Sequence, residues 1–275
     1  MNDTVLWHID GRGVATVTLN RPQVNNAYNG DLIAGLHTAM DGLERERGLR
    51  IVVLKGNGRH FQAGADLAWI RAVAAQGPRE NREVSRLTAE AICRLDTCPV
   101  PTLALIQGGC FGGGTGIAAA CDIVVAAENA IFSISETRWG LMAGIILPHL
   151  CRAMGVRQVR RYALTGERFD AAEARRIGFV HEVCPVSELE ATGQKVVEAV
   201  LMNAPAATTA TKLRTLSSAG AFLDEGDLRD LVEEHARTRQ QAEATEGLAS
   251  FREKRKPAWY PEQRRNSGDS QEPIA

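Results

Sequence analysis

The sequence has no strong charge of either sign and no long apolar segment. Its 32 lysines and arginines balance 33 aspartates and glutamates, which gives a net charge of -1 at pH 7. This balance disfavours nucleic acid and anionic membranes as partners, because both select strongly basic surfaces. No run of about 18 apolar residues occurs, so we expect no transmembrane helix.

Cysteine is present without any pattern that would use it in a metal site or a redox pair. The chain shows neither a CxxC motif nor a Cys/His spacing typical of zinc ligands. The N-terminus, "MNDTVLWHID", has neither the basic nor the apolar region of a secretory signal. We therefore expect reduced thiols, no metal and a cytoplasmic location. The six cysteines are Cys93, Cys98, Cys110, Cys121, Cys151 and Cys184.

The chain does contain short strands and helices in a repeating order. The alternating segments "TVLWHID" and "VATVTLN" are joined by "GRG" and predict a β-hairpin. Apolar spacing predicts helices over 29–48 and 79–97, and buried strands over 50–56 and 102–108. Repeated strand, strand, helix units of this kind indicate an α/β fold.

The composition changes near Pro205, and we use this change to divide the chain. Residues 1–204 are expected to form the α/β core. Residues 205–261 are helical in pattern, are rich in charge and have no strand to pack on, which favours a role in oligomerisation. Residues 262–275 are polar and are expected to form a disordered tail.

A glycine-rich stretch, "GGCFGGGTG" over 108–116, brings backbone amides close to whatever binds there. A Walker phosphate loop needs GK[ST], which does not follow. A dinucleotide loop needs GxGxxG, and although Gly112 and Gly114 supply the first two glycines, the third position is Ile117. The stretch therefore matches neither phosphate motif.

The same stretch also contains Gly-x-Cys-x-Gly, the cysteine form of a nucleophile elbow. In a hydrolase, Cys110 would be the nucleophile, and His181 or His235 would be the base. The competing interpretation is that Cys110 packs as a small apolar residue beneath the loop. We favour packing, because a free cysteine usually behaves as a buried hydrophobe.

The remaining interpretation is an oxyanion hole. A strand that runs into a glycine-rich helix start presents free amides and the positive end of a helix dipole. Such amides stabilise the oxygen of an enolate, but a second donor is needed. The segment "FQAGADLA" over 61–68 predicts a second strand, turn and helix of the same kind.

From residue 4 to about 261, the chain resembles the crotonase superfamily of enoyl-CoA hydratases and isomerases. The resemblance is carried by "LNRPQVNNAY", "FQAGADL", "CFGGGTGIAAACDIVVAAENAIFSISE", "GLMAG", "LTGERFDAAEARRIGFVHEV" and "EGLASFREKRKPAW". It implies a spiral of ββα units followed by a helical trimerisation region, assembled as a homo-trimer or a dimer of trimers. It also implies an acyl-CoA substrate and no separate cofactor. The flanking motifs look most like bacterial 3-methylglutaconyl-CoA and isohexenylglutaconyl-CoA hydratases.

The resemblance also assigns residues to the site. The amides of Ala65 and Gly113 would bind the thioester carbonyl. Phe251 and Lys254 match residues that reach a neighbouring subunit's CoA. The positions that would bind this subunit's CoA are Val24, Ala63, Ala65, Asp66, Leu67 and Ala68.

Hydratases of this superfamily use two glutamates, and this chain keeps only one of them. Glu136 occupies the second position, whereas the first is Gly116. We expect the missing side chain at 116 to open space, and a glutaconyl substrate to bring its own carboxylate. Gly144 falls where the superfamily uses a backbone amide to hold water. His149 is another polar candidate, although a lone histidine is more often structural.

The sequence thus predicts a hydratase that acts on a branched 2-enoyl-CoA, most simply isohexenylglutaconyl-CoA or 3-methylglutaconyl-CoA, in acyclic terpenoid or leucine breakdown. The first alternative is an enoyl-CoA isomerase that uses Glu136 alone. A cysteine hydrolase with Cys110 and a non-catalytic binding module remain as more distant alternatives.

Overall fold

A hairpin at the N-terminus opens the main sheet. In the computed structural model, which describes residues 3–218 and 225–261, β1 (Val5–Ile9) pairs antiparallel with β2 (Val14–Leu19). Each later strand is parallel to its neighbour, and the order is β1-β2-β3-β4-β6-β9. The added strands are β3 (Ile51–Gly56), β4 (Thr102–Ile106), β6 (Ile123–Ala127) and β9 (Glu182–Cys184).

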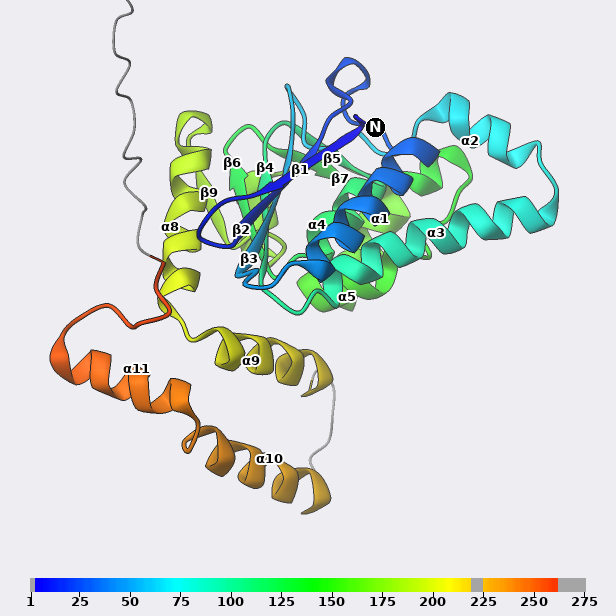
Figure 1. Cartoon of the computed structure of the whole chain (residues 1–275). Helices are drawn as coiled ribbons and strands as arrows, with labels where there is room; N and C mark the ends of the chain where they lie inside the picture. The colour runs from blue at the N-terminus through cyan, green and yellow to red at the C-terminus, as the bar shows by residue number, and fades with distance from the viewer. Residues whose placement is uncertain (1–2, 219–224, 262–275) are drawn as a thin grey trace, which may run out of the picture.

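Helices cover both faces of this sheet, as Figure 1 shows. On one face lie α1 (Gly30–Arg45), α3 (Pro78–Asp96) and α4 (Gly113–Ala120), and on the other lies α8 (Leu189–Met202). Successive residues of β4 alternate between the two cores: Ala104 packs on the first side, and Leu103 packs on the α8 side. Burial on both faces explains why β3 and β4 read as near-continuous apolar runs.

A small second sheet stands beside the first and carries the glycine-rich loop. It has the order β5-β7-β8, formed by β5 (Gly109–Phe111), β7 (Ile131–Ser133) and β8 (Phe169–Asp170). Phe132 stacks on Phe169, with ring centroids 5.5 Å apart, and this packing fixes β7 against β8. Because β5 runs directly into α4, the loop between them is held at both ends.

Shorter elements complete the core. The remaining helices are η1 (Pro22–Val24), α2 (Leu67–Ala74), η2 (Glu136–Trp139), α5 (Leu147–Met154), α6 (Val156–Thr165), α7 (Ala171–Arg176) and η3 (Val186–Glu188). The predicted hairpin and α/β class are confirmed. The strand predicted at the start of the segment 61–68 is wrong. Residues there form only isolated bridges, Gln62 to Cys110 and Ala65 to Tyr28.

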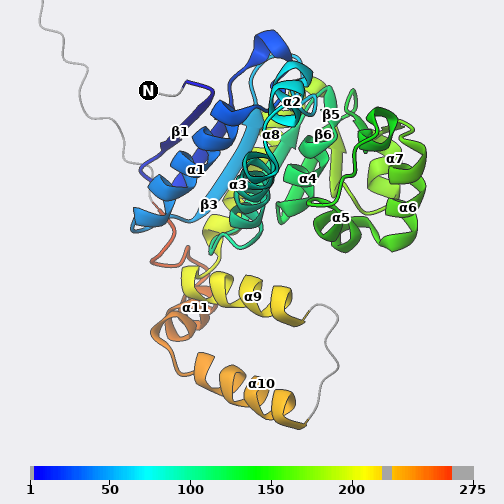
Figure 2. The ribbon, with the colours of Figure 1, turned by 90° about the vertical axis from the view of Figure 1, so that its right-hand side faces the viewer.

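Three helices, α9 (Pro205–Ser218), α10 (Glu225–Thr238) and α11 (Ala242–Glu253), follow the core. Figures 1 and 2 show them as an arm that extends below the sheet and its helices. Apolar side chains on this arm are open to solvent, and Phe251 is 85% exposed. The predicted tail over 262–275 lies outside the described residues.

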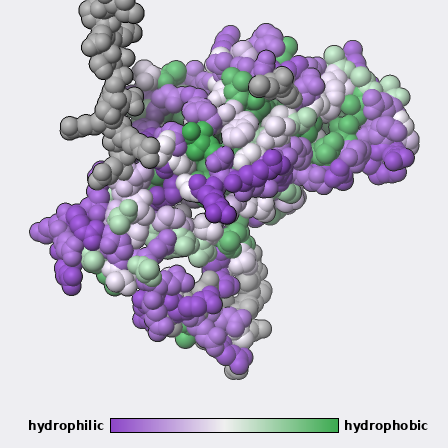
Figure 3. Space-filling view, in the orientation of Figure 1, coloured by the Kyte–Doolittle hydropathy of each residue, from purple (hydrophilic) through white to green (hydrophobic). Residues whose placement is uncertain are grey.

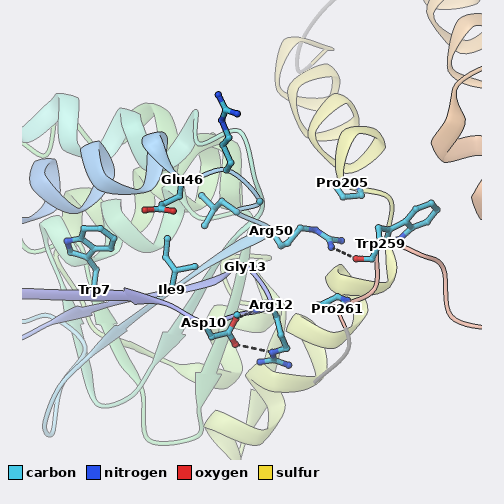
Figure 4. Close-up of a pocket in the computed structure, with 14 residues that line it drawn as sticks. Trp7, Ile9, Asp10, Arg12, Gly13, Glu46, Arg50, Pro205, Trp259 and Pro261 are labelled. Atoms are coloured by element: carbon cyan, nitrogen blue, oxygen red, sulfur yellow. Dashed lines mark hydrogen bonds and ion pairs between the residues drawn. The ribbon is translucent and has the colours of Figure 1, made fainter. Parts of the chain in front are cut away.

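Polar contacts join the core to α9, to the end of α8 and to the segment that follows α11. Lys212 on α9 pairs with Asp122 at 2.7 Å and donates to the Val100 carbonyl. Arg50 donates to the carbonyl oxygens of Trp259 and Asn203 at 2.9 and 2.8 Å, and Figure 4 shows it reaching Trp259 across a groove.

The outer surface is largely hydrophilic on the face drawn in Figure 3, with small separate hydrophobic patches on the core. Within residues 3–218 and 225–261, no helix combines the length and apolar character needed to span a bilayer.

Candidate active site

The two segments with a glycine turn before a helix, 61–68 and 108–116, lie side by side. We call them the two glycine elbows. The amide of Gln62 donates to the carbonyl of Gly109 at 3.1 Å, and the amide of Phe111 donates to the carbonyl of Gln62 at 2.9 Å. Gly64 has a φ of +89° and lies so close to β5 that a Cβ there would be 3.4 Å from the Phe111 carbonyl oxygen. The extended segment before α2 therefore runs in register with the strand before α4.

This arrangement leaves two backbone amides free. On one elbow, Tyr28 bonds to Gly64 and to Asp66, at 2.8 and 2.9 Å, and so bypasses the amide of the intervening Ala65. On the other elbow, Gly113 is the first residue of α4, where helical amides have no intrahelical acceptor. Among the described residues, neither Ala65 N nor Gly113 N donates a hydrogen bond. Both residues line one cavity of about 230 Å³.

Glu136 lines the same cavity and supplies its only carboxyl group among the described residues. A Cβ on Gly112 would be 3.1 Å from Glu136 Oε1, so the missing side chain at 112 lets the carboxyl group approach the loop. Its Oε2 atom is buried and has no hydrogen-bond partner within the described residues. Burial raises the pKa of Glu136, and the amides of Glu136 and Ser135 partly oppose that rise.

Tyr28 forms another wall of the cavity. Burial, together with the charge of Glu136, raises the pKa of Tyr28 to about 12. The phenol therefore stays protonated at neutral pH. The Tyr28 ring also meets Trp69 edge to face, with centroids 5.7 Å apart, which fixes its position beside Gly113.

The space expected at Gly116 is absent, so that prediction was wrong. A Cβ on Gly116 would lie 2.1 Å from Cγ2 of Ile146 and 2.7 Å from its Cβ. Ile146 is 2% exposed and belongs to the apolar core. The position of the missing first glutamate is therefore filled by the side chain of Ile146, contributed from a separate part of the chain.

Comparison with known proteins identifies the family of this chain. A family described as "Enoyl-CoA hydratase/isomerase" matches residues 10–263. The chain belongs to the enoyl-CoA hydratase/isomerase family. The crystal structure of an enoyl-CoA hydratase from Shewanella pealeana is 36% identical in sequence to this chain and superposes on it with a TM-score of 0.88. The match covers 93% of this chain and 96% of the Shewanella chain.

Curated members of the family with different names are also similar. The short-chain-enoyl-CoA hydratase of Clostridium acetobutylicum is 32% identical over 212 residues, which are 76% of this chain and 80% of the relative. The mitochondrial Delta(3,5)-Delta(2,4)-dienoyl-CoA isomerase of Dictyostelium discoideum is 30% identical over 258 residues, which are 90% and 88% of the two chains. The predicted crotonase fold and the predicted enzyme class are confirmed.

The structure brings together only some of the residues that the family resemblance assigns to CoA. Ala63, Ala65 and Leu67 line the cavity. Asp66 instead caps α2 through the amide of Ala68 and pairs with Arg21 at 3.3 Å. The other assigned residues lie outside the lining of this cavity: Val24, Asp66, Ala68, Gly144, Phe251 and Lys254.

His149 lies apart from this family site. It is buried on α5, where its Nδ1 is 2.9 Å from Arg152 and 3.5 Å from Asp96. The Arg152 and His149 contacts lower the pKa of Asp96 despite its burial. We assign His149 to packing between α3 and α5, as expected for a lone histidine.

Cys110 also has a structural environment. It is fully buried in β5, and burial raises the pKa of its thiol far above the ordinary value. His181 Nδ1 accepts the amide of Val124 in the main sheet, and His235 is exposed on the arm. Within residues 3–218 and 225–261, Cys110 therefore has neither the reactive thiolate nor the paired base of a cysteine hydrolase.

Sequence reasoning missed two arginines that line the cavity with Glu136. Arg138 follows Glu136 in η2, and Arg168 stands between α6 and β8. The position of Arg138 two residues after Glu136, the end of the "SISE" segment, was a usable signal. Arg168 had no local signal, because only the fold brings its loop to the cavity.

Proposed function

We propose that this enzyme is a hydratase that adds water across the double bond of a branched 2-enoyl-CoA, with a glutaconyl-type thioester as its substrate. The observation that carries the proposal is the cavity where the free amides of Ala65 and Gly113 face the same space as the carboxyl group of Glu136. Amides of this kind stabilise a thioester oxygen as it becomes an enolate.

Each step of hydration has a group in this cavity. The carbonyl oxygen accepts hydrogen bonds from Ala65 N and Gly113 N, which draws electrons from Cβ. Glu136 takes a proton from water while the hydroxyl adds to Cβ, and the enolate forms. The protonated Glu136 then gives its proton to Cα, so the product has gained one water. The raised pKa of Glu136 suits a group that must act first as a base and then as an acid.

A single carboxyl group restricts which substrate suits the enzyme. Gly116 carries no acid, and Ile146 fills its surroundings, so any second carboxylate that assists Glu136 would have to come from the substrate. The distal carboxylate of a glutaconyl thioester is such a group. A methyl branch would place the reaction in leucine breakdown, and an isohexenyl branch would place it in acyclic terpenoid breakdown.

We further propose a homo-trimer or a dimer of trimers, in which Phe251 and Lys254 of the arm meet the CoA of a neighbouring subunit. Within a subunit, Val24, Asp66 and Ala68 would extend the CoA site beyond the cavity. CoA is part of the substrate, and the proposed reaction needs no other cofactor. The cytoplasmic location stays a prediction from the sequence.

An isomerase is the second candidate, and the same filled position favours it. Moving a proton between two carbons of one substrate needs only one carboxyl group. Relatives named as a hydratase and as an isomerase are both similar to this chain.

The test is incubation in ¹⁸O-labelled water with 3-methylglutaconyl-CoA, isohexenylglutaconyl-CoA and crotonyl-CoA. We expect products that gain one labelled oxygen at Cβ, with glutaconyl thioesters turned over far better than crotonyl-CoA. Double-bond migration without label would establish the isomerase. Equal rates on crotonyl-CoA would contradict the role of the distal carboxylate.

A further inference from the structure

The cavity around Glu136 contains more positive than negative charge. Its charged lining residues are Arg138, Arg168 and Glu136. Trp139 and Leu141 line the same space and give it an apolar side. One negative charge on a bound group, added to the charge of ionised Glu136, would balance the two positive charges of the guanidinium groups.

Both arginines lie near the turn that ends α6. Gly166 ends α6 with a φ of +61°, and a Cβ there would lie 2.8 Å from Arg138 Nε. The Arg138 side chain therefore crosses the turn that leads to Arg168 two residues later. The Arg168 guanidinium lies 5.5 Å from the centroid of the Phe111 ring, and Phe111 runs into the oxyanion loop. Contacts with the walls thus hold each arginine at the cavity.

No protein group neutralises these arginines within the described residues. Neither side chain forms an ion pair or a hydrogen bond there. Nearby arginines differ: Arg161 pairs with Glu167 at 2.7 Å, and Arg176 pairs with Glu173 at 2.5 Å. Glu136 has no ion pair with either cavity arginine, and burial leads the causes of its pKa shift. The guanidinium groups are therefore available to a ligand.

We propose that Arg138 and Arg168 bind the distal carboxylate of the acyl group, which rests on the glutaconyl substrate of the proposed function. Guanidinium groups form paired, charge-assisted hydrogen bonds with a carboxylate. In this proposal the thioester oxygen is held by Ala65 and Gly113. The end of the acyl group that carries the distal carboxylate then lies toward the remaining walls of the same cavity. Trp139 and Leu141 there provide contact for an apolar branch.

Binding of glutaryl-CoA and butyryl-CoA tests this assignment without any turnover. Both thioesters are saturated, and only glutaryl-CoA carries a distal carboxylate. We expect titration calorimetry to show that the native enzyme prefers glutaryl-CoA. Arg138→Met and Arg168→Met should each reduce this preference by roughly 10- to 100-fold, the scale of a lost hydrogen bond to a charged group. Arg168→Lys should restore part of it, because the charge remains without the paired geometry.

Arg157→Met serves as the matched control, because Arg157 is exposed on α6 and lies outside the lining of this cavity. It should keep the native preference. Equal weakening of both thioesters by the cavity variants would assign the arginines to the CoA phosphates and overturn the proposal. An unchanged preference would overturn it as well. If the preference falls as expected but no thioester gains water, the hydratase proposal fails while the carboxylate site stands.

Discussion

Placing a methyl group at position 116 tests the packing that replaces the first glutamate. In Gly116→Ala, the new Cβ would lie 2.1 Å from Cγ2 of Ile146, which is buried and cannot turn to solvent. Because carbon atoms prefer separations of about 3.5–4.0 Å, Ile146 or α4 must move by roughly 1.4 Å. Overpacking of this kind costs about 1–3 kcal/mol. Relief of glycine's backbone entropy in a helix returns roughly 0.5–1 kcal/mol.

The net loss in the free energy of unfolding should be about 0–2.5 kcal/mol, centred on about 1 kcal/mol, which corresponds to a fall in Tm of at most roughly 10 °C. Thermal and urea unfolding measure it. Gly30→Ala is the control, because its new Cβ would have Trp69 Nε1 as its nearest neighbour, at 3.6 Å. The loss in the free energy of unfolding of the double variant Gly116→Ala/Ile146→Ala should be smaller than the sum of the losses of the two single variants, by roughly 0.5–3 kcal/mol. Stabilisation by Gly116→Ala alone, or strict additivity in the cycle, would refute this account of position 116.

Other parts of the account can be checked independently. Cys110→Ala should keep most of the turnover while losing stability, and abolished turnover with stoichiometric release of free CoA would establish the hydrolase. Light scattering should give a trimer or a hexamer, and a monomer at micromolar concentration would contradict the role of Lys254 at an interface. Because the pKa of Glu136 is higher in the folded than in the unfolded state, the folded state holds more protons between these two pKa values. The free energy of unfolding therefore falls as the pH rises through them. Glu136→Gln should therefore raise Tm at neutral pH, with a gain that vanishes below about pH 4.

Features carried by local motifs could be predicted from the sequence. Two segments with glycine in a turn before a helix, 61–68 and 108–116, are visible in the sequence itself. The assignment of Ala65, Gly113 and Glu136 to the site came from the resemblance of "AGAD", "GGG" and "SISE" to motifs of the superfamily. The hairpin and the buried strands follow from alternation and from apolar runs, because those patterns arise within a single element.

Features that depend on contacts between distant segments could not be predicted. Ile146 fills the space beside Gly116 although β6, β7 and η2 lie between them in the chain, and no local pattern of apolar residues identifies that partner. The strand β5 has three residues, which is too short for periodicity to show. Arg168 joins the cavity only because β8 pairs with β7, and so the charge of the site became apparent only in the folded chain.

The central claim is that the carboxyl group of Glu136 moves the proton while the two amides hold the thioester. The most direct test is the turnover of Glu136→Gln on a glutaconyl thioester, with Glu128→Gln as control, since Glu128 is exposed and lies outside the lining of this cavity. We predict that Glu136→Gln loses at least ~10²-fold in turnover, the usual scale for a general acid–base group, while the affinity for the CoA thioester and the turnover of the control are retained. Near-native turnover of Glu136→Gln would contradict the account.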